Sequence, residues 1–187
     1  MLNASAHLDP PPRRLLVGGP SGVGKTTFAR RVAAATGLPH TEIDALFHGP
    51  GWTVLPNFEE SVIRFTDAAG WVTEWQYTRQ LGDLLPSRAD TLVWLDYPAR
   101  VHMYRLIMRT LRRRVRHVEL WNGNIEPPLR TILWDPEHII RWGWRGRRKL
   151  RERVIAAEHD HPHLRVIRIG SQRDADRFLK TLSPIRP

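Results

Sequence analysis

Gly19-Pro20-Ser21-Gly22-Val23-Gly24-Lys25-Thr26 is the stretch that decides the fold, because it matches the phosphate-binding pattern GxxxxGK[ST]. The apolar run 15–17 precedes it and a helix-like run, 27–36, follows it. A strand, a glycine loop and a helix in this order form the usual setting of a nucleotide site. A glycine-rich turn that merely links a strand to a helix is the alternative interpretation.

The spacing of this motif has a chemical reason. Glycines allow backbone N–H groups to converge on phosphate oxygens, and the N-terminus of the next helix adds its positive dipole. The lysine then reaches the β- and γ-phosphates, while the threonine hydroxyl ligates Mg²⁺. The motif therefore predicts a site for ATP and Mg²⁺, with Thr26 as a metal ligand. The predicted nucleotide-binding residues of this segment are Gly19, Ser21, Gly22, Val23, Gly24, Lys25, Thr26 and Thr27.

The length and composition predict one domain. The chain has 187 residues, of which 41% are hydrophobic, so it can bury one sizeable core. The first twelve residues end in three prolines, at positions 10–12. We therefore expect a disordered lead-in over residues 1–12 and a single domain over residues 13–187.

Charge and apolar patterning restrict the partners and the location. The sequence has no run of about 18 apolar residues and no secretory signal pattern at its start, so we expect a cytoplasmic protein that does not enter a membrane. Without cysteine, disulfides and thiolate sites are excluded. The net charge of +10 calls for an anionic partner, and a polyphosphate ligand, nucleic acid and an acidic membrane surface all qualify.

Apolar segments alternate with helix-like segments along the whole chain. Short strands are expected at 40–43, 71–74, 91–96 and 164–169, in addition to the one before the glycine loop. Helices are expected after the glycine loop and over 57–70, after Pro98, from Asp135-Pro136-Glu137 to about 157, and over 174–182. This alternation predicts an α/β fold of the P-loop NTPase type, with a five-stranded parallel sheet flanked by helices.

Acidic residues stand at the ends of three predicted strands. Ligands of doubly wound folds bind beyond the carboxyl ends of the strands, so Asp44 could orient or deprotonate an acceptor hydroxyl. Glu74, at the end of the third strand, is the second candidate and is expected to order Mg²⁺ through water. The competing interpretations are a turn-capping aspartate and a solvated strand end.

An arginine-rich helix follows Pro98. Its expected apolar stripe is Val101, Tyr104, Met108, Leu111 and Val115. Arginines lie one residue later at successive turns and could clamp phosphates in a bidentate manner. The residues expected in this clamp are Arg105, Arg109, Arg112 and Arg113. A solvated basic face is the alternative.

Taken together, the ordered motifs resemble small P-loop kinases of the adenylate-kinase-like group, in particular the subgroup often labelled DNA topology-modulation proteins. The segments that carry the resemblance are 18–27, 42–52, 88–98 and the arginine-rich helix up to Glu119-Leu120-Trp121-Asn122-Gly123-Asn124. The resemblance implies a nucleoside-monophosphate-kinase-like fold, a mobile arginine-bearing lid over about 105–130, and ATP-dependent phosphoryl transfer. One position departs from the pattern: Trp75 stands in Glu74-Trp75-Gln76-Tyr77 where the family has a glycine.

Further site residues follow from position and from this resemblance. Lys25, Asp44, Arg105 and Arg109 are the predicted catalytic residues. On the nucleotide side the resemblance adds Arg109, Arg113, Ser171 and Gln172, the last two after the fifth strand. On the acceptor side we expect Asp44, Trp52, Glu74 and Arg79. The family pattern also ranks Asp96 below Glu74 as a magnesium-side acid.

Three functions fit the sequence. The first is an ATP-dependent small-molecule kinase whose acceptor is a nucleotide or nucleoside. The second is a P-loop kinase for another acceptor, such as a zeta-toxin-like nucleotide-sugar kinase or an antibiotic kinase. The third is a nucleotide-gated regulator that binds nucleic acid through its basic helices. The sequence specifies neither the acceptor nor the oligomeric state.

Overall fold

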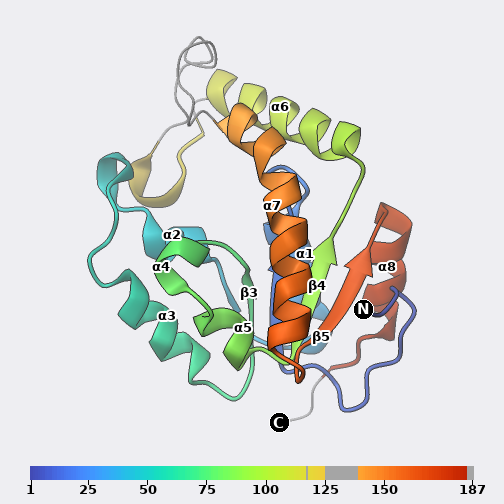
Figure 1. Ribbon diagram of the computed structural model, residues 1–187. Helices are drawn as coiled ribbons and strands as arrows, with labels where there is room; N and C mark the ends of the chain where they lie inside the picture. Colours follow the sequence, from blue (N-terminus) through green and yellow to red (C-terminus); the bar gives the residue numbers. More distant parts are fainter. Residues whose placement is uncertain (117, 125–138, 185–187) are drawn as a thin grey trace.

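A computed structural model describes residues 1–116, 118–124 and 139–184, without the side chains of 139–147. Its centre is a sheet of five parallel strands in the order β2-β3-β1-β4-β5. Figure 1 labels β3, β4 and β5 of this sheet. The strands are β1 (Arg14–Gly18), β2 (His40–Thr41), β3 (Trp71–Glu74), β4 (Thr91–Leu95) and β5 (Arg165–Ile169). The predicted α/β fold with a five-stranded parallel sheet is confirmed.

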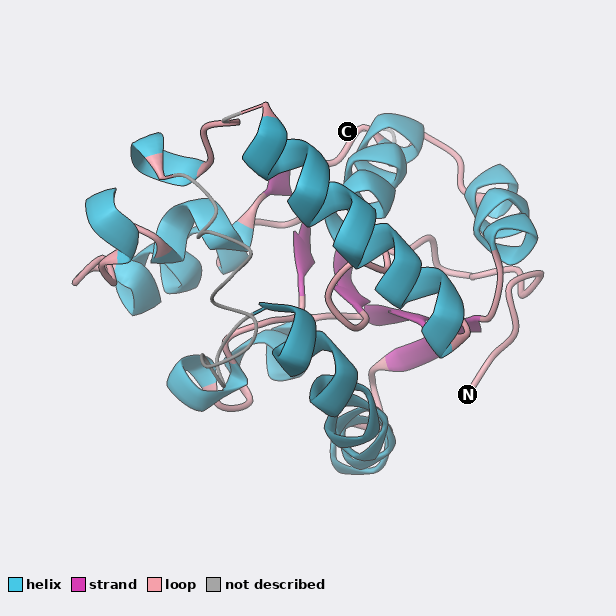
Figure 2. Cartoon of the chain, turned by 90° about the horizontal axis from the view of Figure 1, so that it is seen from above, coloured by secondary structure: helices cyan, strands magenta, loops and turns pink. Residues whose placement is uncertain are grey.

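Helices cover both faces of the sheet (Figure 2). Side chains of a strand alternate between the two faces, so Leu15 and Val17 pack on one face while Leu16 packs on the other. The first face is covered by α1 (Lys25–Thr36) and α8 (Gln172–Thr181). The second is covered by α2 (Ile43–Phe47), α3 (Phe58–Thr66), α4 (Thr78–Leu81), α5 (Leu84–Arg88) and α7 (Ile139–Asp160). Burial on both faces explains why the central strands read as continuous apolar runs.

The second strand is shorter than the sequence predicts. We expected a strand over 40–43, but α2 begins at Ile43. The Glu74 carboxylate accepts a hydrogen bond of 3.2 Å from the backbone N–H of Ile43 and so satisfies a free donor at the start of α2. This contact between distant residues ends the strand early and turns the chain into the helix that carries Asp44.

Helix α6 (Ala99–Val115) does not bury the expected apolar stripe. Tyr104 and Val115 are 67% and 75% exposed, and the buried residues are His102, Leu106 and Thr110. The reason is the tight contact of α6 with the glycine loop: a Cβ atom on Gly22 would lie 2.5 Å from the Cβ of Leu106. The face of α6 that contacts this loop is therefore buried, although it includes polar residues. Hydrophobic residues on the other faces of the helix, such as Tyr104 and Val115, stay exposed.

The first residues contact the sheet, which differs from the disordered lead-in expected over residues 1–12. Leu2 pairs with β5 through its N–H to Val166 (2.7 Å) and through its carbonyl oxygen, which accepts from the N–H of Arg168 (3.0 Å). Ala4 and Leu8 are buried in the core on the α1 and α8 face. The prolines at 10–12 suggested disorder, but the apolar residues before them reach the sheet.

Two further features complete the fold. Short 3₁₀ helices lie at η1 (Pro50–Trp52) and η2 (Trp121–Gly123). The predicted helix start at Asp135-Pro136-Glu137 and the part of the lid beyond residue 124 lie outside the described residues. Within the described ranges, no helix is long and apolar enough to cross a membrane.

Candidate functional site

The glycine loop joins β1 to α1 at the carboxyl edge of the sheet. Gly22 and Gly24 have φ angles of +81° and +104°, a backbone region that favours glycine. The space beside Gly24 is open: a Cβ there would meet only the Nη1 atom of Arg105, at 3.9 Å. These features fit a polyphosphate group: the backbone curls, the space beside Gly24 is free for a ligand, and a twelve-residue helix begins at the loop.

Lys25 is the first residue of α1, and its side chain reaches back to the glycine loop. Its ammonium donates to the carbonyl oxygens of Gly19 (3.0 Å) and Pro20 (3.5 Å). Burial lowers the pKa of Lys25 to about 8, an effect that the Asp44 and Glu74 carboxylates oppose and the Arg109 guanidinium reinforces. Asp44, Glu74 and Arg109 therefore lie within electrostatic reach of Lys25.

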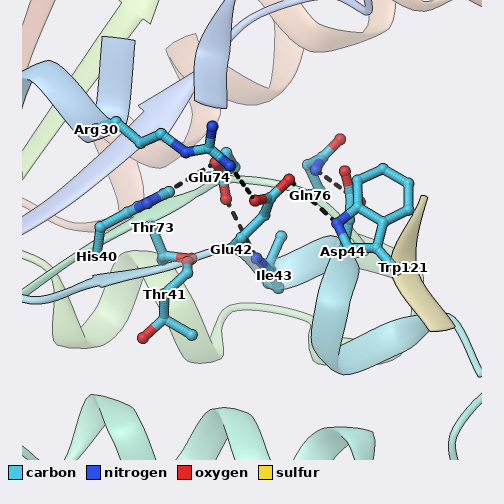
Figure 3. Close-up of polar contacts among 10 residues, drawn as sticks. All are labelled: Arg30, His40, Thr41, Glu42, Ile43, Asp44, Thr73, Glu74, Gln76 and Trp121. Atoms are coloured by element: carbon cyan, nitrogen blue, oxygen red, sulfur yellow. Dashed lines mark hydrogen bonds and ion pairs between the residues drawn. The ribbon is translucent and has the colours of Figure 1, made fainter. Parts of the chain in front are cut away.

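Asp44 is held in place by two side chains from the segment after β3. Gln76 Nε2 donates to Asp44 Oδ1 over 3.0 Å, as Figure 3 shows, and the Tyr77 hydroxyl donates to the same atom over 2.5 Å. Neither bond uses Oδ2. One oxygen of Asp44 is therefore fixed by the protein, and its charge acts on Lys25.

Glu74 anchors the helix of Asp44. The residue is fully buried, and its two oxygens contact His40 Nε2 (3.1 Å) and the N–H of Ile43 (3.2 Å; Figure 3). Burial alone would raise the pKa of Glu74, but its hydrogen bonds and the charge of His40 outweigh burial, so the pKa is lowered. These contacts make Glu74 a support of the β2–α2 turn.

Arg105 is already docked on the glycine loop. Its guanidinium donates to the carbonyl oxygen of Val23 (3.1 Å) and to Gln172 Oε1 (3.3 Å), and it lies 5.3 Å from the ring centroid of Tyr97. This differs from the expected mobile lid residue, because Arg105 belongs to the half of α6 that packs against Gly22. Arg109 follows one turn later.

Two of the other residues expected on the nucleotide side, Ser171 and Gln172, follow the carboxyl end of β5. Ser171 caps α8, since its hydroxyl accepts a bond of 3.2 Å from the N–H of Asp174. Gln172 opens the same helix and contacts Arg105. Arg113 lies one turn beyond Arg109, at the C-terminal end of α6.

The segment Trp121–Asn124 forms a wall beside α2, which the sequence did not indicate. Asn124 is buried: its Oδ1 accepts from the N–H of Trp52 (2.8 Å), while its Nδ2 donates to the carbonyl oxygens of Gly49 (2.9 Å) and Trp121 (2.7 Å). Trp121 Nε1 donates to Glu42 over 3.1 Å, and Glu42 also pairs with Arg30 of α1 (Figure 3). The chain that returns from α6 is thus tied to the loop after Asp44.

Aromatic rings fill the corner between this wall and α2. The rings of His48 and Trp121 are stacked, with centroids 5.5 Å apart and planes 24° apart. Trp52 meets the edge of His48 at 5.0 Å and is 37% exposed. Trp52 therefore lies close to Asp44's helix, as expected, but it packs against protein rings.

Three candidates lie away from this cluster. Arg79, in α4, lines a cleft of about 270 Å³ against α7. Asp96 forms an ion pair with Arg168, with Asp96 Oδ2 lying 2.6 Å from Nη2 and 2.9 Å from Nε. Trp75 is 7% exposed and packs in the core on the α7 face. Its bulk is therefore accommodated by the core.

No protein-family model matches the chain. A solved shikimate kinase from Acinetobacter baumannii, in complex with shikimate, is similar over 90% of this chain and 89% of its own, with 16% identity and a TM-score of 0.54. That likeness shows a shared fold. The expected resemblance to P-loop kinases is thereby confirmed for the fold alone.

Cytidylate kinases are similar over one short stretch. The protein from Nitratidesulfovibrio vulgaris is 45% identical over 49 residues, 25% of this chain and 21% of its own length. The one from Oleidesulfovibrio alaskensis is 48% identical over 44 residues, 24% of this chain and 20% of its own. The chain thus matches only about a fifth of the length of these curated relatives.

Proposed function

We propose that this chain is an ATP-dependent kinase that transfers the γ-phosphate to a small-molecule acceptor, with a nucleotide or nucleoside as the preferred class. The observation that carries the proposal is the convergence of Lys25 and Asp44. The Lys25 ammonium lies over the glycine loop, Asp44 is fixed on one side by Tyr77, and the two charges, which come from separate elements, act on each other. Phosphoryl transfer needs this pairing of phosphate neutralisation with acceptor positioning.

On the nucleotide side, each residue has a defined task. The loop from Gly19 to Gly24 and the N-terminus of α1 would hold the phosphates, with Lys25 on the β- and γ-phosphates. The glycine-loop motif makes the Thr26 hydroxyl the protein ligand of Mg²⁺, and Glu74 would act through water. Among the described residues, no group of three or more His, Cys, Asp or Glu side chains could hold a metal ion. Bound Mg²⁺ would neutralise charge on the phosphates.

On the acceptor side, Asp44 would accept the hydrogen bond of the attacking hydroxyl through Oδ2. The wall made by Trp121–Asn124 and Trp52 would border the acceptor. The short match to cytidylate kinases agrees with a nucleotide-like acceptor. Arg79 could reach an anionic group of the acceptor only from the α7 side of α4. A sugar or antibiotic acceptor remains the alternative within the same chemistry.

The position of Arg105 favours a kinase over a nucleic-acid-binding regulator. A helix that binds DNA presents its arginines outward to phosphates. Arg105 instead points inward, to Val23 and Gln172, and Arg109 acts on Lys25. Arg105 thus contacts the glycine loop and α8, which supports a role at the nucleotide site.

The test is an ATP-consumption screen over nucleosides, nucleotides, sugars and antibiotics, with duplex DNA binding measured in parallel. Lys25→Ala should abolish turnover and sharply weaken ATP binding with an unchanged melting temperature. Lys149→Ala, which removes an exposed lysine of α7, is the matched control. Wild-type turnover in Lys25→Ala would refute the proposal, and salt-dependent DNA binding without turnover would favour the regulator.

A further inference from the structure

Tyr77 lies between two polar groups of the acceptor side. Its hydroxyl oxygen is 2.5 Å from Asp44 Oδ1 and 3.0 Å from His48 Nε2. The ring is fixed by stacking on Phe47, with centroids 4.0 Å apart, and by the edge of Phe58. Its backbone has a φ of +55°, which costs a non-glycine residue energy, so the surrounding structure holds Tyr77 where its hydroxyl meets Asp44.

The protons of this chain can be assigned from chemistry. A tyrosine hydroxyl has one proton, and burial and the nearby Asp44 carboxylate raise the pKa of Tyr77, so the hydroxyl stays protonated. The carboxylate can only accept, so this proton points to Asp44. Burial lowers the pKa of His48, with Asp44 opposing, so its ring is neutral near pH 7. The Nε2 atom of His48 must then bear the proton that completes its contact with the Tyr77 oxygen.

The direction of donation is therefore His48 to Tyr77 to Asp44. Gln76 adds a second donor on the same Oδ1 atom. Among the charged groups around Asp44, Lys25 of α1 is the nearby cation, Glu74 of β3 is engaged by His40 and Ile43, and Arg109 of α6 acts on Lys25. Two donors on one oxygen restrict rotation of the carboxylate and direct Oδ2 away from both of them.

We propose that Tyr77 is a positioning residue that fixes the Asp44 carboxylate for phosphoryl transfer, and that neutral His48, protonated on Nε2, is the terminal donor of the chain. This inference rests on the proposed kinase function, because it assigns Oδ2 to the acceptor hydroxyl. It also gives a task to Gln76 and Tyr77, the last two residues of the Glu74-Trp75-Gln76-Tyr77 segment.

The kinetic test is Tyr77→Phe, which keeps the ring and removes the hydroxyl. Loss of a hydrogen bond to a charged group should lower kcat roughly 10- to 100-fold. The acceptor KM and the ATP Kd should stay within about twofold of the wild-type values. In an Asp44→Asn background the same change should alter kcat by less than about twofold, because Tyr77 acts through Asp44. Tyr104→Phe, which removes an exposed hydroxyl, is the matched control.

Two results would overturn the proposal: an unchanged kcat in Tyr77→Phe, or an equal loss in the wild-type and Asp44→Asn backgrounds, which would show a merely structural role. A second measurement is independent of activity. Nitrogen NMR of the imidazole in the ligand-free protein should show His48 protonated on Nε2 alone, and its Nε2 signal should move in Tyr77→Phe. A Nδ1-protonated or charged ring refutes the chain even if no acceptor is found, whereas failure of the acceptor screen alone refutes the kinase.

Discussion

Lys25 and Asp44 are electrostatically coupled across the glycine loop: the Asp44 carboxylate raises the pKa of a lysine that burial lowers to about 8. The residue expected to bind phosphate and the residue expected to orient the acceptor therefore influence each other. A substitution of Asp44 should therefore alter the pH dependence of ATP binding by Lys25. A substitution of Lys25 should likewise alter the pH dependence of phosphoryl transfer through Asp44.

ATP binding should weaken above pH 8. Phosphate binds the protonated ammonium, so above the pKa of the free protein, binding requires uptake of a proton and the affinity should fall about tenfold per pH unit. Calorimetric titration with a non-hydrolysable ATP analogue between pH 7 and 9.5 measures this slope. Lys25→Arg keeps its charge throughout and should show a flat profile; a flat profile in the wild type would contradict the assignment.

Asp44→Asn should separate binding from transfer. Loss of a general base or positioning group lowers the rate by roughly two to four powers of ten, while ATP affinity at pH 7 should change little. Removing the carboxylate also removes a charge that raises the pKa of Lys25, so the midpoint of the ATP affinity profile should move to lower pH. Wild-type rates on every accepted substrate would reduce Asp44 to a structural turn residue.

Arg109→Ala should depress kcat more than it weakens ATP affinity, because its guanidinium acts beside Lys25 where charge develops during transfer. Arg109→Lys should rescue poorly, since a point charge does not replace a bidentate fork. Arg151→Ala, which truncates an exposed arginine of α7, provides the comparison. Intact turnover with a DNA affinity whose salt slope falls by about one would favour nucleic-acid binding instead.

Asn124→Ala should loosen the wall of the acceptor side. It removes a buried amide that contacts Trp52, Gly49 and Trp121, which should destabilise the protein by about 1–3 kcal/mol. The acceptor KM should rise while the ATP Kd stays constant. Asn57→Ala is the matched control, because Asn57 is exposed and makes no capping bond through its side chain. An acceptor KM equal to that of the wild type would exclude Asn124 from the site's wall.

Local patterns predicted much of the fold, and long-range contacts account for the rest. The strand–loop–helix unit around Lys25 is encoded by neighbours in the sequence, so it was predictable. The start of α2 at Ile43 depends on Glu74, 31 residues away, and the buried face of α6 depends on its fit to Gly22. Neither contact leaves a periodic signal in the sequence.

Some residues of the candidate site were predicted from the sequence, and others were not. Asp44 was found from its place at a strand end, but its partners Gln76 and Tyr77 were not. Their position just beyond β3, at the edge where Asp44 was expected, was the signal that could have indicated them. Asn124 belongs to a segment that carries the family resemblance, but its contacts were not predicted, because a buried amide inside a loop is recognised only through its partners.

The pairing of Leu2 with β5 has a consequence for association between chains. An open edge strand presents unpaired N–H and C=O groups to which another chain can add, and this is a common route to aggregation. Here Leu2 occupies part of the β5 edge, and the opposite edge is β2, which is only two residues long. The sheet therefore offers a second copy of the chain little backbone to extend.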